Sequence, residues 1–187
     1  LPPFRRIVAG AALPVIADIH FDAALALGAL EAGAHGIRIN PGNIGGNAKL
    51  KAVIRLAAQR RVPIRIGVNA GSLEKRHRGL PRAEAMARSL LDRVRFFEEQ
   101  GFRDLKLSLK SHDVAETVAA NRLADRACDY PLHLGVTEAG TILDGGIRSA
   151  VGIGSLLLDG IGSTIRVSLT ADPVREIGIA RRILAAV

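Results

Sequence analysis

Polar residues recur two or four positions apart in six short apolar stretches of this sequence. They are Asp18 and His20; Arg38 and Asn40; Arg65 and Asn69; Lys106, Ser108 and Lys110; His133 and Thr137; and Arg166 and Ser168. Residues spaced by two in a β-strand share one face, so each stretch would present its polar side chains to the same side. Guanidinium groups bind phosphate oxygens in a planar fork, ammonium groups add a point charge, and Asn and Ser supply neutral donors. Arg38, Arg65, Lys110 and Arg166 together suit a diphosphate better than a single phosphate.

Glu138 is the acid best placed to move a proton beside such an anion. It lies in the tetrapeptide TEAG, just after the fifth apolar stretch. A single arginine in a strand could equally be buried and paired with a carboxylate, and Asp18 and His20 could cap the following helix. Six stretches with the same pattern favour a shared ligand, because burying several unpaired cations costs several kcal/mol each. The pattern therefore indicates an anion-binding site.

Composition narrows the class of protein, but it does not show which kind of anion the protein binds. The chain has 187 residues, of which 48% are hydrophobic, as expected for one folded domain or a large part of one. A net charge of +8 attracts anions, whether nucleic acid, acidic membrane or a phosphorylated metabolite. Only 3% of the residues are aromatic, which leaves few platforms for stacking bases, and the basic residues form no run. Nucleic-acid binding is therefore disfavoured.

The single cysteine excludes an internal disulfide and any cysteine-based metal site built from this chain alone. That cysteine is Cys128, for which a small buried side chain is the simplest interpretation. No apolar run approaches the ~20 residues of a membrane span, and no secretory signal pattern begins the chain. We expect no membrane partner, no metal ligand in this chain and a cytoplasmic location.

The apolar stretches predict strands that alternate with helices. We expect six strands, at 15–20, 36–40, 64–69, 104–110, 132–137 and 164–169. Asp22 is a predicted N-cap and Gly33 a predicted C-terminal stop for the first intervening helix, while Asp172 and Pro173 begin the last, which should turn Ile177 and Leu184 inward. Repeated βα units form parallel sheets, either an open doubly wound sheet or a (β/α)8 barrel. Polar residues toward the carboxyl end of every strand favour the barrel, whose active sites lie there.

Long stretches of the sequence resemble the barrel domain of the 4-hydroxy-3-methylbut-2-enyl diphosphate synthase family. They are ADIHFD at 17–22, RINPGNIG at 38–45, PIRIGVNAGSLEK at 63–75, LSLK at 107–110, PLHLGVTEAG at 131–140 and DGIGSTIRVSLTADP at 159–173. They follow the order of the family and cover nearly the whole chain. The resemblance implies a TIM barrel and an oxidoreductase of the non-mevalonate isoprenoid pathway.

What the resemblance implies about chemistry agrees with the polar pattern. The family opens 2-C-methyl-D-erythritol 2,4-cyclodiphosphate and removes a hydroxyl oxygen, using two electrons from a [4Fe-4S] cluster that flavodoxin or ferredoxin reduces. At matching positions, Glu138 would be the acid or base, and Asp18 and His20 would line the mouth of the barrel. The residues implied to grip the diphosphate are Arg38, Asn40, Arg65, Asn69, Lys110, Arg166 and Ser168.

The sequence also departs from the family pattern. The family holds its cluster with three cysteines and a glutamate in a C-terminal domain, and its barrel has eight strands rather than six. Residues 1–187 are therefore expected to form a partial TIM barrel, inactive alone, that lacks the first two βα units and the cluster domain. The resemblance also implies a homodimer. The alternatives are another phosphate-binding barrel, similar to a pterin-handling synthase, or a basic module that binds RNA.

Overall fold

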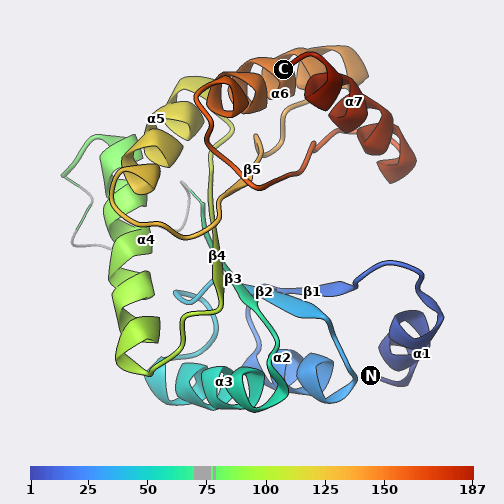
Figure 1. The fold of residues 1–187 in the computed structure, drawn as a ribbon, viewed down its shortest axis with the longest axis vertical. Coiled ribbons are helices and arrows are strands. Elements are labelled where there is room, and N and C mark those ends of the chain that lie inside the picture. Colours follow the sequence, from blue (N-terminus) through green and yellow to red (C-terminus); the bar gives the residue numbers. More distant parts are fainter. Residues whose placement is uncertain (70–76, 78) are drawn as a thin grey trace. The chain divides into compact units, whose positions relative to one another are not determined.

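The computed structural model describes residues 1–69, 77 and 79–187, so AGSLEK at 70–75 in the third matching stretch lies outside the described residues. The chain divides into two compact units. The first unit comprises Leu1–Gly67 and Asp92–Lys106, and the second comprises Val68–Leu91 and Leu107–Val187. Strands and helices alternate along both units (Figure 1).

The first unit consists of parallel strands with helices in the connections. Its elements are α1 (Pro2–Gly10), β1 (Ile16–Ile19), α2 (Ala23–Glu31), β2 (Gly36–Ile39), α3 (Asn47–Arg60) and the start of β3 (Ile64–Asn69). The Asp22 side chain accepts a hydrogen bond from the backbone N–H of Ala24 and so begins α2, as predicted. Gly33 has a φ of 93°, which suits the left-handed end of that helix.

β2 is the most enclosed strand of the first unit. All four of its residues are buried, and Ile37 and Ile39 are 0% exposed. β2 contacts α2, and Leu50, Val53 and Ile54 form the buried stripe of α3. In Figure 1, α2 and α3 lie side by side, and the two helices contact each other. Burial of its apolar side chains fixes β2 and therefore the direction of the side chains along it.

The second unit contains most of the later βα repeats, whereas residues 92–106 belong to the first unit. The helices and strands that follow β3 are α4 (Arg82–Glu99), β4 (Leu105–Lys110), α5 (Val114–Asp125), β5 (His133–Leu134), α6 (Ile142–Leu158), β6 (Thr164–Ile165) and α7 (Pro173–Ala185). Asp113 caps α5 and Asp172 caps α7, each through its carboxylate. α6 packs against both α5 and α7.

The pairs β1–β2, β2–β3 and β5–β6 are parallel. One sheet has the order β1-β2-β3-β4, and β5 pairs with β6 in a second. A single parallel bridge joins Leu107 of β4 to Leu132 just before β5. All six predicted strands are thus confirmed among the described residues, with β1 and β6 at sheet edges.

Two details of the prediction are wrong. β5 and β6 span only two residues each, because the backbone beyond them bonds to other groups: Thr137 N–H donates to Ser111 O, and Leu169 N–H donates to the carboxylate of Glu176 in α7. On α7, Ile177 and Leu184 are 55% and 53% exposed instead of turned inward, and Ile183 is the buried residue. The apolar repeat thus correctly predicted that α7 is a helix, but it did not predict which side of that helix is buried.

Candidate functional site

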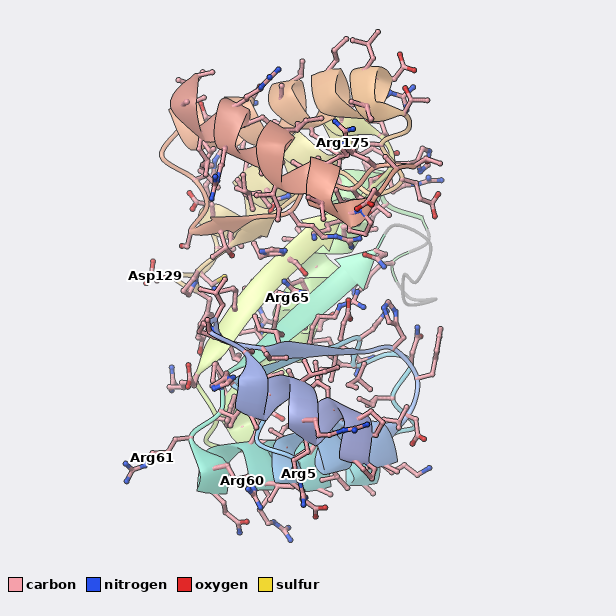
Figure 2. The ribbon with its side chains drawn as sticks, turned by 90° about the vertical axis from the view of Figure 1, so that its right-hand side faces the viewer. Arg5, Arg60, Arg61, Arg65, Asp129 and Arg175 are labelled. Atoms are coloured by element: carbon pink, nitrogen blue, oxygen red, sulfur yellow. The ribbon has the colours of Figure 1, made fainter. Side chains whose placement is uncertain are left out.

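Parallel register brings three of the predicted site residues into one row in the first unit. Asp18 of β1 lies opposite Arg38 of β2, and Arg38 lies opposite Arg65 of β3. Partners in register on neighbouring strands share a face of the sheet. In Figure 2, Arg65 lies over the strands, whereas Arg60 and Arg61 extend outward from the end of α3. The row therefore gathers two guanidinium groups and one carboxylate on one face.

Arg38 is the centre of this group. Its side chain is only 8% exposed, and its Nη1 lies 2.9 Å from Asp18 Oδ1. The same Nη1 lies 3.1 Å and 2.9 Å from the two ring nitrogens of His20, and His20 Nε2 is 3.3 Å from Asp18 Oδ1. The Asp18 and His20 side chains are both 47% exposed. The buried guanidinium of Arg38 thus contacts Asp18 and His20, which solvent reaches. An anion could approach Arg38 from that side.

The loop after β2 is ordered by its own polar side chain. Asn40 Oδ1 accepts a hydrogen bond from Gly42 N–H at 3.2 Å, and Asn40 O accepts one from Asn43 N–H at 3.0 Å. Gly45 and Gly46 have φ values of 97° and 92°, which suit glycine before α3 begins. Asn40 is buried, so one of its roles is to shape the turn that follows Arg38.

Lys110 and Arg166 meet around a glycine in the second unit. Arg166 N–H donates to Leu134 O at 2.9 Å, which continues the pairing of β5 with β6. A Cβ placed on Gly135 would lie 2.6 Å from Arg166 O and 3.3 Å from Lys110 Nζ. The Lys110 side chain therefore lies directly over the Gly135 backbone. Sequence reasoning missed Gly135, although an isolated glycine in a strand pattern is the signal of such a close approach.

Glu138 has an unusual backbone conformation. Its φ is 51°, in the left-handed region that residues other than glycine rarely adopt, and its side chain is exposed. The loop 137–140 that carries it is fixed at both ends: Thr137 N–H donates to Ser111 O at 3.0 Å, and Thr170 N–H donates to Gly140 O at 2.8 Å. Strained backbone held by its surroundings is concentrated at functional sites. Glu138 is therefore a candidate acid or base on structural grounds as well.

The remaining predicted positions lie at strand ends of the second unit. Asn69 ends β3 and is half-buried, as is Ser168 two residues after Arg166. His133, one of the polar residues in the sequence pattern, places Nδ1 2.8 Å from Thr164 Oγ1 across the β5–β6 pair. The structure thus brings Asp18, His20, Arg38 and Arg65 together in the first unit. In the second it places the Lys110 side chain and the backbone carbonyl of Arg166 next to Gly135, with Glu138 in the loop that follows.

No metal centre is formed by the described residues. No group of three or more His, Cys, Asp or Glu residues among them could hold a metal ion. Cys128 is half-buried, and its Sγ lies 3.5 Å from Ala124 O within one helical turn. The residues that the structure describes therefore do not fit an iron–sulfur cluster. None of the helices described is both long enough and apolar enough for a membrane span.

Solved structures with a similar fold are α/β barrel enzymes. Dihydropteroate synthase of Xanthomonas albilineans aligns over 99% of this chain and 72% of its own, with a TM-score of 0.62 and 18% identity. Dihydropteroate synthase of Yersinia pestis aligns over 99% and 76%, with a TM-score of 0.62 and 12% identity. At these identities the likeness shows the fold alone.

Curated relatives are much closer in sequence. The chain is 58% identical over 177 residues to a protein of Geobacter sulfurreducens named 4-hydroxy-3-methylbut-2-en-1-yl diphosphate synthase (flavodoxin), covering 93% of this chain and 50% of the relative. It is 56% identical over 175 residues to the protein of that name from Geobacillus thermodenitrificans, covering 92% and 47%. The chain thus spans about half the length of these relatives.

A family model for the GcpE TIM-barrel domain matches residues 3–181. That range contains every predicted site residue, from Asp18 to Ser168. The parallel βα order of the described residues agrees with this match, although fewer than the eight strands of a whole barrel are present. The chain belongs to the GcpE TIM-barrel domain family.

Proposed function

We propose that this chain is the substrate-binding part of a 4-hydroxy-3-methylbut-2-en-1-yl diphosphate synthase that uses flavodoxin as electron donor. The proposal rests on Arg38 near the carboxyl end of β2. Its buried guanidinium lies beside Asp18 and His20, which solvent reaches. Relatives that are 56–58% identical to this chain over the aligned residues bear that name. The proposed substrate is 2-C-methyl-D-erythritol 2,4-cyclodiphosphate.

Binding of the diphosphate is assigned to cations that lie on the strands or directly after them. These cations are Arg38, Arg65, Lys110 and Arg166, for which the family resemblance implies this role. Charge-assisted hydrogen bonds from these groups are stronger than neutral ones, and they would stabilise the charge that develops on the diphosphate as the ring opens. Asn40, Asn69 and Ser168 would add neutral donors that orient the phosphates.

Three residues are assigned to proton handling and alignment. Glu138 is exposed on a loop fixed at both ends, so its carboxyl group could exchange a proton with the substrate without moving the backbone. Asp18 would hold Arg38 in place through their 2.9 Å contact, and His20 would line the same mouth. The conversion takes up electrons and protons and releases the hydroxyl oxygen as water, so a proton donor is required.

The electrons must reach the substrate from outside the described residues, which offer no cluster site. We propose that a [4Fe-4S] cluster is held by a C-terminal domain beyond residues 1–187, and that two further βα units complete the barrel. We further propose that the full-length synthase is a cytoplasmic homodimer. The fold likeness to dihydropteroate synthases does not favour pterin chemistry, because the identity of 12–18% shows no shared site.

Calorimetric titration of the full-length synthase with 2-C-methyl-D-erythritol 2,4-cyclodiphosphate tests the proposal. Arg38→Ala and Arg166→Ala should each weaken binding about ten- to a hundred-fold, the effect of a hydrogen bond to a charged group worth about 1.5–3 kcal/mol. Arg60→Ala removes the same charge from an exposed position at the end of α3 and should leave affinity within about two-fold. Because Arg166 is exposed, its replacement should not disturb folding. Unchanged affinity in both site variants would refute the assignment of the diphosphate site.

A further inference from the structure

Ser111 connects the end of β4 to the loop that carries Glu138. It follows Lys110 directly and is 2% exposed. Its carbonyl oxygen accepts the 3.0 Å hydrogen bond from Thr137 N–H, next to Glu138 in the chain. Any rotation of the peptide that follows Ser111 would therefore move the acceptor that fixes the start of the 137–140 loop.

The other polar atoms of Ser111 are also bonded. Its N–H donates to Thr117 Oγ1 at 3.1 Å, and its hydroxyl donates to Glu116 Oε2 at 2.7 Å. The same hydroxyl oxygen accepts a hydrogen bond from Asp113 N–H at 3.2 Å. A residue bonded at N–H, hydroxyl and carbonyl has no rotational freedom left without breaking one of these bonds.

Glu116 is itself held in place. Its backbone N–H donates to Asp113 Oδ1 at 2.7 Å, and its Oε1 lies 3.6 Å from Arg82 Nε at the start of α4. The Glu116 side chain is 28% exposed, so its bond to Ser111 is only partly screened by water. The bond between a hydroxyl and a carboxylate is of the strong, charge-assisted kind. The orientation of Ser111 therefore depends on where α5 places Glu116.

We propose that Ser111, oriented by Glu116, is a positioning residue that fixes the 137–140 loop and thereby the carboxyl group of Glu138. The inference deepens the proposed function and rests on it for the role of Glu138. Ser111 touches neither the reacting atoms nor the diphosphate in this scheme; it acts through the carbonyl that receives Thr137 N–H. Loss of its hydroxyl should therefore reduce turnover much more than substrate affinity.

Kinetics of the full-length synthase test the role in turnover. Ser111→Ala should lower kcat about ten-fold, the effect of one charge-assisted hydrogen bond, and change KM less than about two-fold. Glu116→Gln, which keeps an acceptor oxygen for the hydroxyl, should lose less activity than Glu116→Ala. In a Glu138→Gln background, Ser111→Ala should cause no further loss, because the two residues act in one path.

A matched control is available in α6. The hydroxyl of Ser149 is buried and makes no hydrogen bond within the described part of the chain. Ser149→Ala therefore removes the same atom from a buried site of the same unit without removing a bond, and kcat should stay within about two-fold of the parent.

Hydrogen exchange gives a readout that does not depend on activity. Peptides that contain Thr137 should exchange about ten-fold faster in Ser111→Ala than in the parent or in Ser149→Ala, because residue 111, whose carbonyl accepts from the Thr137 amide, loses the hydroxyl bonds that help to hold it. Equal exchange and equal kcat in the two serine variants, or fully additive losses with Glu138→Gln, would overturn the inference. If instead the parent synthase neither binds nor converts the cyclodiphosphate, the proposed function fails, and the exchange data still report on the Ser111 bond.

Discussion

Adding one methyl group at Gly135 should damage both stability and substrate binding. A Cβ at this position would lie 2.6 Å from Arg166 O, a backbone atom that cannot rotate away. Non-bonded heavy atoms normally approach to about 3.5 Å, so β5 and β6 would have to separate locally by roughly 0.9 Å. That movement breaks the 2.9 Å bond from Arg166 N–H to Leu134 O.

The cost of Gly135→Ala follows from these two effects. Overpacking a buried site costs about 1–3 kcal/mol, and loss of a backbone hydrogen bond adds about 0.5–1.5 kcal/mol. The free energy of unfolding should therefore fall by about 2–4 kcal/mol, which lowers the melting temperature by about 4–16 °C for a domain of this size. Displacement of Lys110 and Arg166 should also weaken cyclodiphosphate binding about ten-fold or more.

Gly178→Ala is the matched control for this prediction. Gly178 lies within α7, is exposed, and a Cβ there would meet no atom within 4 Å. The same change should therefore stabilise the helix by about 0.5–1 kcal/mol and leave binding intact. Thermal unfolding followed by circular dichroism and calorimetric titration of both variants in the full-length synthase provide the comparison. If Gly135→Ala melts with the parent and binds equally well, the close approach of Gly135 to Arg166 is wrong.

Three further predictions concern the first unit, the edges of the sheets and the charge of the chain. Asp18→Ala should lower the free energy of unfolding by about 1–2 kcal/mol in chemical denaturation, because it leaves the buried Arg38 guanidinium without its half-exposed carboxylate. An unchanged midpoint would show that His20 alone is a sufficient partner for Arg38. Residues 1–187 expressed alone should aggregate in light scattering, since β1 and β6 are edge strands and Leu143 and Leu158 are 72% and 73% exposed. A sharp, reversible melt of a monomer would contradict this. Generic RNA should bind the full-length synthase only weakly despite the charge of +8; tight binding with a steep salt dependence would favour an RNA-binding module instead.

The order of strands and helices was predictable because each signal was local. Period-two patterns located the six strands, and helical patterns located the helices between them. Asp22 and Asp172 indicated where two helices begin, because each caps its helix through a side-chain hydrogen bond that spans only two residues. Strand length was less predictable. The ends of β5 and β6 depend on Ser111 and Glu176, whose bonds to the backbone near these strands form only in the folded chain.

The candidate site was predictable to the level of residue type and face. Alternation placed Asp18, Arg38 and Arg65 on one side of the strands, and their register confirms that they are neighbours. Alternation could not show that Arg38 would be buried while His20 stays half-exposed, because burial depends on packing from other elements. The positive φ of Glu138 was equally hidden, since it is imposed by bonds at both ends of its loop.

At Glu138, the residue that best fits the left-handed backbone differs from the residue that the proposed chemistry requires. Glycine and asparagine adopt a φ of 51° more readily than glutamate, and the loop is held by the backbone of Thr137 and Gly140 rather than by the Glu138 side chain. A library of variants at Glu138 sorted only for thermal stability should therefore become enriched in glycine and asparagine and lose turnover. Retention of glutamate in such a library would mean that its side chain, and not only its chemistry, supports the fold.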